Sequence, residues 1–158
     1  MTVAIYLKVE GVKGEAKPKE GWIDVLSFNW AAAQPGNMMV GGGGGAGKVM
    51  FDDLSVQACI DRASPTLLGF CASGKHISKV ILSVNKAGGE KIEYARIELE
   101  DVIITRVNFS GVGKTENILV NYVFQAAKVS QHYWEQTNTG GKSAEIVSGW
   151  DIKKNQAL

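Results

Sequence analysis

The segment from Gly42 to Lys48 comes close to a phosphate-binding motif. It reads G-x-x-x-x-G-K, a spacing in which glycine amides surround a phosphate and the lysine contacts it. The motif continues with a Ser or Thr whose hydroxyl binds magnesium, and with a helix whose N-terminal amides face the phosphate. Here Val49 follows, and the next residues have the character of a strand. The segment therefore does not predict a nucleotide site, and we expect no cofactor.

The two histidines, His76 and His132, are the next candidates for chemistry. Metal centres and hydrolytic triads need histidine, cysteine or carboxylate groups brought together. Cys71 precedes His76 by five residues, so a small Cys/His hydrolase is one alternative. The other interpretation of His76 is a histidine near a helix C-terminus, where the helix dipole favours it. We expect His132 at the surface or an interface, both Cys59 and Cys71 reduced, and no catalytic or metal-binding residues.

Acidic and aromatic residues offer two further possibilities. Glu98 and Glu100 would share one face of a strand, beside Asp101. Paired carboxylates can perform acid–base chemistry or bind calcium, but on a strand they more often form a solvated face or a site for ion pairs between strands or subunits. The four tryptophans leave a carbohydrate-binding β-sandwich as a second alternative, although Trp22 and Trp30 fall on an apolar face that suits a core.

The elements that must position these residues are mostly strands. Alternation of apolar and polar residues predicts strands at 3–9, 22–32, 80–85, 92–99, 102–109 and 118–134, with extended character at 49–60 and a loop at 138–143. One short helix is predicted over 65–73, with Ser64 as its N-cap, Pro65 in the first turn and Gly74 just beyond its end. The expected fold class is mainly β, as a single barrel or sandwich with one short helix.

The strand at 22–32 has two different faces. Trp22, Leu26, Phe28 and Trp30 share one face, which we expect to be the core face because of its aromatic side chains. Ser27, Asn29 and Ala31 take the other face, and their small or polar character suits a wet surface.

The composition is that of one soluble domain spanning residues 1–158. Of these residues 45% are hydrophobic and 21% charged, and the net charge of +1 with no Lys/Arg run gives no reason to expect nucleic acid as a partner. No apolar run approaches the ~18 residues of a transmembrane helix, and the N-terminus lacks the pattern of a signal peptide. We therefore expect no membrane insertion, and synthesis in the cytosol.

Several ordered motifs resemble one family. They are G-V-K-G-E at 11–15, I-D-V-L-S-F at 23–28, G-G-G-G-G-A-G-K at 41–48, A-S-P at 63–65, C-A-S-G-K-H at 71–76, K-A-G-G-E at 86–90, L-E-D-V at 99–102 and G-W-D at 149–151. Together they resemble the haemolysin-coregulated protein (Hcp) family, the inner-tube subunit of the bacterial type VI secretion system. The similarity runs from the first strand to the last residues.

This resemblance implies a β-barrel with one flanking helix, similar to the tail-tube proteins of contractile phages. It implies hexameric rings that stack into a hollow tube, surrounded by a sheath and tipped by a spike above a baseplate, and secreted effectors held in the lumen. The protein would be cytoplasmic before firing and then secreted without a signal peptide. The resemblance implies no catalytic residues.

The resemblance also suggests where contacts form. It places the strand 22–32 near the lumen, so Ser27, Asn29 and Ala31 become the candidate cargo-facing residues. The glycine run needs a partner to become ordered, because glycine loses much entropy on ordering. The candidate ring or stacking contact therefore consists of Gly41, Gly42, Gly43, Gly44, Gly45 and Lys48.

Overall fold

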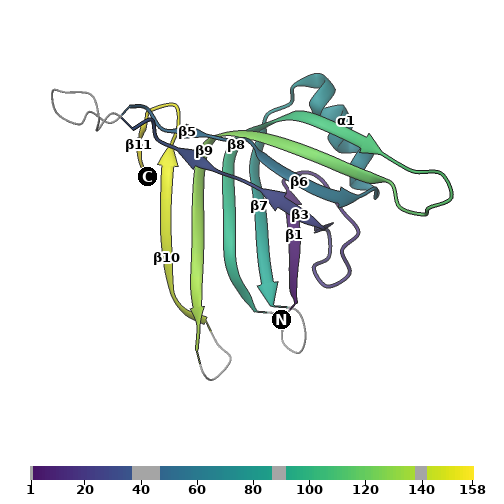
Figure 1. Ribbon diagram of the computed structural model, residues 1–158, viewed down its shortest axis with the longest axis horizontal. Coiled ribbons are helices and arrows are strands. Elements are labelled where there is room, and N and C mark those ends of the chain that lie inside the picture. The colour runs from purple at the N-terminus through teal and green to yellow at the C-terminus, as the bar shows by residue number, and fades with distance from the viewer. Residues whose placement is uncertain (1, 37–46, 87–91, 138–141) are drawn as a thin grey trace.

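The computed structural model describes residues 2–36, 47–86, 92–137 and 142–158, and it is mainly β with one helix (Figure 1). This confirms the predicted fold class. The strands are β1 Val3–Val9, β2 Ile23–Val25, β3 Ser27–Asn29, β4 Ala32–Ala33, β5 Met50–Phe51, β6 Leu54–Cys59, β7 Ile77–Lys86, β8 Glu93–Ser110, β9 Leu119–Gln136, β10 Lys142–Asp151 and β11 Gln156–Ala157; the helix is α1, Ala63–Ser73.

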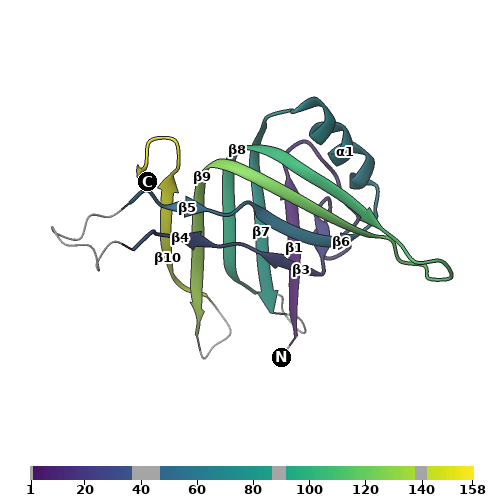
Figure 2. The same ribbon diagram turned by 45° about the horizontal axis from the view of Figure 1, so that its top comes forward.

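Long strands connect two layers of one antiparallel sheet. The main path runs β11-β10-β9-β8-β7-β1-β2, and a branch runs from β9 through β6 to β3. The first part of β9 pairs with β6, and the part from Lys128 onward pairs with β10. Figure 2 shows β3 and β6 crossing in front of the strands β1, β7 and β8. The two faces that meet between these layers enclose the hydrophobic core.

The path of paired strands does not close as a simple barrel would, because it ends at β2 and at β11. The wall instead continues through the chain itself at Leu26. Residues before Leu26 pair with β1, residues after it pair with β6, and the Leu26 amide donates a 2.8 Å hydrogen bond to the carbonyl oxygen of Gln57. One bent segment therefore links the two layers.

The bend at Leu26 also corrects the prediction for the strand at 22–32. Before the bend it is Ile23 and Val25 that are buried, at 1% and 8% exposure, while Leu26 is 55% exposed. After the bend Phe28 lies opposite the fully buried Val56 and thus on its side of the sheet. The alternation changes phase at Leu26, so the expected aromatic core face, with Trp22 and Leu26 on it, was wrong for the first half.

The second half follows the predicted direction with less burial than expected. Phe28 remains 39% exposed because β3 pairs with β6 on one side only. Trp30 is partly buried against the core and stacks on Phe51, with ring centroids 5.8 Å apart.

The helix begins two residues earlier than predicted. Its N-cap is Arg62, with no side-chain cap bond, so the assignment of Ser64 as N-cap was wrong. Ser64 lies in the first turn, fully buried, and its hydroxyl shares a 2.7 Å hydrogen bond with the hydroxyl of Tyr122 on β9. The predicted end of the helix is confirmed: Gly74 is the C-cap with φ 66°, a conformation that glycine adopts without strain.

Other expectations met mixed outcomes. The predicted strands 80–85 and 92–99 are confirmed as parts of β7 and β8, which pair antiparallel, and residues 87–91 between them lie outside the described residues. The segments 92–99 and 102–109 form one strand, β8, which passes Asp101 at φ 53°. The strand β10 was not predicted, and it begins inside the expected loop at 138–143. Within the described residues no helix is long and apolar enough to cross a membrane.

The Ser64–Tyr122 bond generates a stability prediction. The hydroxyl of Tyr122 is buried, which raises its pKa and keeps the group protonated, while the hydrogen bond to Ser64 opposes the rise. Ser64→Ala leaves that hydroxyl without this partner, and we expect the free energy of unfolding, measured by urea denaturation, to fall by about 2 kcal/mol.

Two variants control this measurement. Ser73→Ala, an exposed position of the same helix, is expected to change stability by less than about 0.5 kcal/mol. Adding Tyr122→Phe to Ser64→Ala removes the unpartnered hydroxyl and should restore part of the loss; a fully additive double variant would show that the bond contributes nothing.

Candidate functional site

A set of neutral polar side chains covers one face of the layer that β3, β6, the first part of β9 and the last part of β8 form. The alternation that buries Leu54, Val56 and Ala58 turns the residues between them outward. Residues that face each other in a register share a side of the sheet, so this outward side carries a continuous set. We call it the polar face: Ser27, Asn29, Ser55, Gln57, Asn108 and Asn121.

The register arranges the polar face in rows across four strands. In one row Ser27 pairs with Gln57, Gln57 with Asn121, and Asn121 with Asn108. In the next row Asn29 pairs with Ser55, which in turn pairs with Val123. The residues of this face are exposed or half-buried, and the opposite side of the same strands is core.

Hydrogen bonds connect these side chains to one another. The Ser27 hydroxyl donates to Oε1 of Gln57 at 3.4 Å. Nδ2 of Asn121 donates to the Ser55 hydroxyl at 3.0 Å and to the carbonyl oxygen of Val56 at 3.3 Å. Amide and hydroxyl groups carry several donors and acceptors each, so the face retains capacity for a partner. Neutral amide and hydroxyl groups of this kind can form hydrogen bonds with the surface of a partner.

Of the residues predicted to face cargo, the structure places Ser27 and Asn29 on this face. Ala31 is also exposed, just beyond β3, and its carbonyl oxygen accepts a hydrogen bond from the amide of Asp52. In the predicted contact loop, Lys48 is exposed, while Gly41, Gly42, Gly43, Gly44 and Gly45 lie outside the described residues. Sequence reasoning missed Ser55, Gln57, Asn108 and Asn121; the alternation in 54–59 was the signal for the first two.

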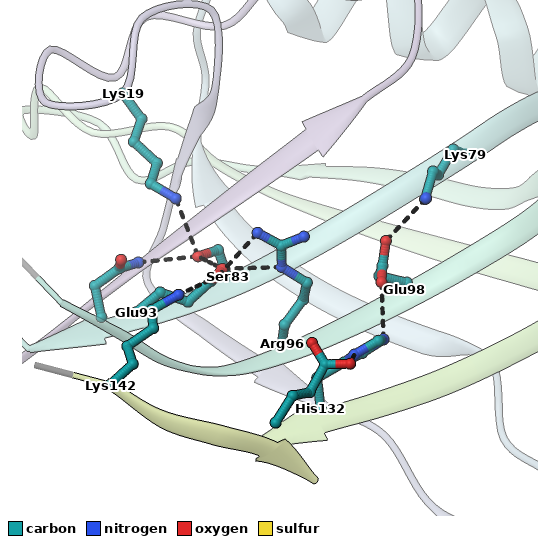
Figure 3. A network of polar contacts seen from close by, with 10 residues as sticks. Lys19, Lys79, Ser83, Glu93, Arg96, Glu98, His132 and Lys142 are labelled. Atoms are coloured by element: carbon teal, nitrogen blue, oxygen red, sulfur yellow. Dashed lines mark hydrogen bonds and ion pairs between the residues drawn. The ribbon is translucent and has the colours of Figure 1, made fainter. Parts of the chain in front are cut away.

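A second polar cluster, the polar network, lies on the other layer (Figure 3). It centres on the carboxylate of Glu93, which is 7% exposed. Arg96 donates to both carboxylate oxygens, at 3.0 and 2.8 Å; Lys142 from β10 lies 3.4 Å away, and Ser83 from β7 also donates to the carboxylate. Lys19, from the loop between β1 and β2, donates to Ser83 at 3.2 Å. The polar network therefore ties a loop and three strands together.

The charges of the polar network set the pKa of Glu93. Burial acts to raise that pKa, but the hydrogen bonds from Arg96 and Ser83 and the positive charges of Arg96 and Lys19 outweigh it, so the pKa lies below its ordinary value. Burial lowers the pKa of Lys19, against the attraction of Glu93. The carboxylate is thus held charged and occupied by cations, which makes it a structural group and not a free acid or base.

The prediction that His132 lies at the surface or an interface was wrong, because its side chain is buried and the residue is only 9% exposed. Its Nε2 lies 2.8 Å from Oε2 of Glu98, and its Nδ1 lies 3.3 Å from Oε1 of Glu145 on β10. Its ring stacks on Trp134. Glu98 also pairs with Lys79 of β7 at 2.9 Å, so the expectation of ion pairs between strands is confirmed for Glu98.

The groups proposed for hydrolysis do not meet. Nδ1 of His76 lies 3.1 Å from Oδ1 of Asp101, and its side chain is 73% exposed. Cys71 is packed partly buried against the core, and within the described residues no hydrogen bond joins it to His76. The described part of the chain holds no group of three or more His, Cys, Asp or Glu arranged for a metal. Both cysteines are free.

The other two candidate sites also lack their geometry. After Val49 the chain enters the strand β5, so no helix begins where a phosphate site needs one, as predicted. Among the tryptophans, Trp30 stacks on Phe51. The ammonium of Lys19 lies 4.4 Å from the ring centroid of Trp22, and that of Lys142 lies 4.2 Å from the ring centroid of Trp134. Faces occupied in this way are not open platforms for a sugar.

Comparison with known proteins gives a consistent family. The model of the family described as "Type VI secretion system effector, Hcp" matches residues 6–133. Protein hcp1 of Pseudomonas aeruginosa is 40% identical over 159 residues, covering 98% of this chain and 98% of that protein.

Solved structures agree. The crystal structure of Hcp1 from Salmonella typhimurium has 34% identity and a TM-score of 0.81, and the match covers all of both chains. A structure described as that of a type six secretion system protein has 25% identity and a TM-score of 0.92, covering 99% of this chain and 100% of that one.

The polar network generates a pH prediction. Glu93→Gln removes a charged acceptor from Arg96 and Lys142, and we expect the free energy of unfolding at neutral pH to fall by about 2 kcal/mol. Because the folded pKa of Glu93 is depressed, its contribution is present above the unfolded pKa and is lost as pH falls through the lower folded pKa. Urea denaturation should therefore show the difference between wild type and variant shrinking below about pH 4.

Glu100→Gln is the matched control, since Glu100 is exposed on the same strand. It should behave like wild type across the pH range. A Glu93→Gln deficit that stayed constant down to acid pH would contradict the charged role of Glu93.

Proposed function

The chain belongs to the Hcp family of type VI secretion system proteins, and on this premise we propose that it is the structural subunit of a hollow tube. In this proposal the chain acts as one domain, copies close into a hexameric ring, rings stack, and the polar face lines the central hole. The lumen then holds secreted effectors before delivery. The observation that carries the proposal is the polar face itself: an exposed, hydrogen-bonding surface directly behind the core.

The chemistry of the polar face supports a role toward varied protein cargo. A hole that must pass different proteins cannot offer large apolar patches, which would hold unfolded or exposed hydrophobic segments. Short hydroxyl and amide side chains such as Ser27, Asn29 and Asn121 instead form hydrogen bonds that water can also satisfy. Binding through such groups is weak per contact and does not demand one cargo shape.

Two features of the sheet support self-association. Among the described strands, β3 pairs with β6 on one side only, and the outer edge of β10 carries only the two-residue strand β11, opposite Trp150 and Asp151. Exposed strand edges readily pair with strands of another chain. The exposed apolar residues Leu26, Ile146 and Val147, at 55%, 66% and 52%, lie near these edges. Contacts between two different patches of one molecule run head to tail and can close into a ring.

The remaining partners follow from the family alone. We propose contacts with the sheath, the spike protein and the baseplate, a cytoplasmic location before firing, and export without a signal peptide. For stacking we propose Gly41, Gly42, Gly43, Gly44, Gly45 and Lys48 as a contact between rings or subunits. Neither the hydrolase nor the carbohydrate-binding module gains an observation, so no second function is proposed.

The lumen assignment is tested by Asn29→Trp. A side chain that points into the hole supports neither the core nor the ring, so we expect an intact ring by native mass spectrometry and a lower level of effector retained in the producing cell. Ser73→Trp, at an exposed position at the end of helix α1, is the matched control and should leave the effector level unchanged. A ring that dissociates while the Asn29→Trp subunit stays folded would make Asn29 an interface residue.

The glycine segment is tested separately. Replacing Gly43 and Gly44 by bulky residues should reduce tube formation, seen by negative-stain microscopy, more than it reduces the melting temperature, because glycine permits close backbone approach between neighbours. Normal tubes together with a lower melting temperature would reverse this assignment.

A further inference from the structure

Arg106 on β8 shares the polar face with the neutral residues described above. It lies opposite Val123, which lies opposite Ser55, which lies opposite Asn29, so one row crosses all four strands. Asn108, two residues further along the same strand, belongs to the neighbouring row. The side chain of Arg106 is exposed. The guanidinium of Arg106 is thus a positive charge among hydroxyl and amide groups.

An irregularity in the strand aims Arg106 outward. Ile104 is 4% exposed and points into the core, so strict alternation would also turn residue 106 inward. The pairing with β9 shifts by one residue between Ile104 and Arg106, and Thr105 is left without a partner in the register. Such a bulge re-aims the side chains after it. It places Arg106 and Asn108 on the polar face, and Val107, opposite the buried Tyr122, on the core side.

Within the described residues Arg106 has no carboxylate partner, since none of the ion pairs found there includes it. Asp53, directly before β6, is an acidic residue bonded to Thr105, the neighbour of Arg106 in the chain. Its carboxylate accepts hydrogen bonds from the Thr105 hydroxyl at 3.1 Å and from Nε2 of Gln125 at 3.4 Å. The short side chain of Asp53 is therefore held by its neighbours. The longer side chain of Arg106 leaves its guanidinium available to a partner.

We propose that Arg106 selects cargo by charge, favouring proteins with acidic surface patches. The inference rests on the proposed function, because it requires the polar face to line the hole. One arginine from every copy then forms a girdle of positive charge around a narrow channel, where charges of one sign reinforce each other. A guanidinium also binds carboxylates in a bidentate manner that neutral neighbours cannot provide. The neutral residues allow cargo proteins of different shapes to bind, and Arg106 favours those with negative surface charge.

The test uses one small monomeric protein as probe, prepared in an acidic and in a basic surface variant of the same fold. Each is produced together with the ring, and the amount retained is measured by size-exclusion chromatography and native mass spectrometry at low and high salt. For the wild-type ring we expect about tenfold more acidic than basic probe, the effect of two or three surface ion pairs of ordinary strength. The preference should fall as salt screens the charges.

Three substitutions complete the design. Arg106→Gln should remove the preference and Arg106→Glu should reverse it. Lys13→Glu, which makes the same change of charge at an exposed position in the loop between β1 and β2, should leave it intact. An intact ring whose Arg106 variants retain the acidic probe like wild type, or a wild-type ring that prefers neither probe, would overturn this inference alone. A wild-type protein that forms no ring would overturn the proposed function and this inference with it.

Discussion

The burial of one side of β6 and of the first part of β9 is the constraint on which the rest depends. Leu54, Val56, Val120 and Tyr122 are each at most 1% exposed, so this side of the layer cannot turn to water without losing about 2 kcal/mol per side chain. Because side chains alternate along a strand, that burial fixes the register and sends the residues between them to the opposite side. The polar face is a consequence of the core: its position cannot change unless the core changes with it.

The second layer is held together partly by polar contacts. Its strands β7, β8, β9 and β10 are long, and the stretch of β10 that pairs with β9 lies beyond the part of β9 that β6 covers. There polar side chains join the strands: Glu93 pairs with Arg96 and with Lys142 of β10, and His132 lies between Glu98 and Glu145 of β10. Moving β10 away would leave the buried carboxylate of Glu93 with one cation fewer, and breaking a buried ion pair is costly. The polar network thus positions β10, whose outer edge is one of the two edges proposed to meet a neighbour.

What the sequence could predict depends on how local the signal was. Alternation in the segment 3–9 and glycine at position 74 identified β1 and the end of α1, because each rests on a single local rule. The bend at Leu26 was not predictable in this way: the residues 22–30 alternate plausibly in either phase, and only pairing with two different strands shows that the phase changes. The same limit applies to His132, which contacts Glu98 and Glu145 on the neighbouring strands, and to Arg106, whose direction depends on a bulge against β9. Ser27 and Asn29 were placed on the outward side correctly because both lie after the bend, where the assumed phase was right, while their cross-strand neighbours required the register.

The central claim is that the polar face surrounds a hole made by copies of this chain. A three-dimensional reconstruction of the assembled protein by electron cryomicroscopy tests it most directly. The account predicts a closed ring in which Ser27, Asn29 and Asn121 of every copy face the central channel. A ring that carries these residues on its outer wall, or buries them between neighbouring copies, would contradict it.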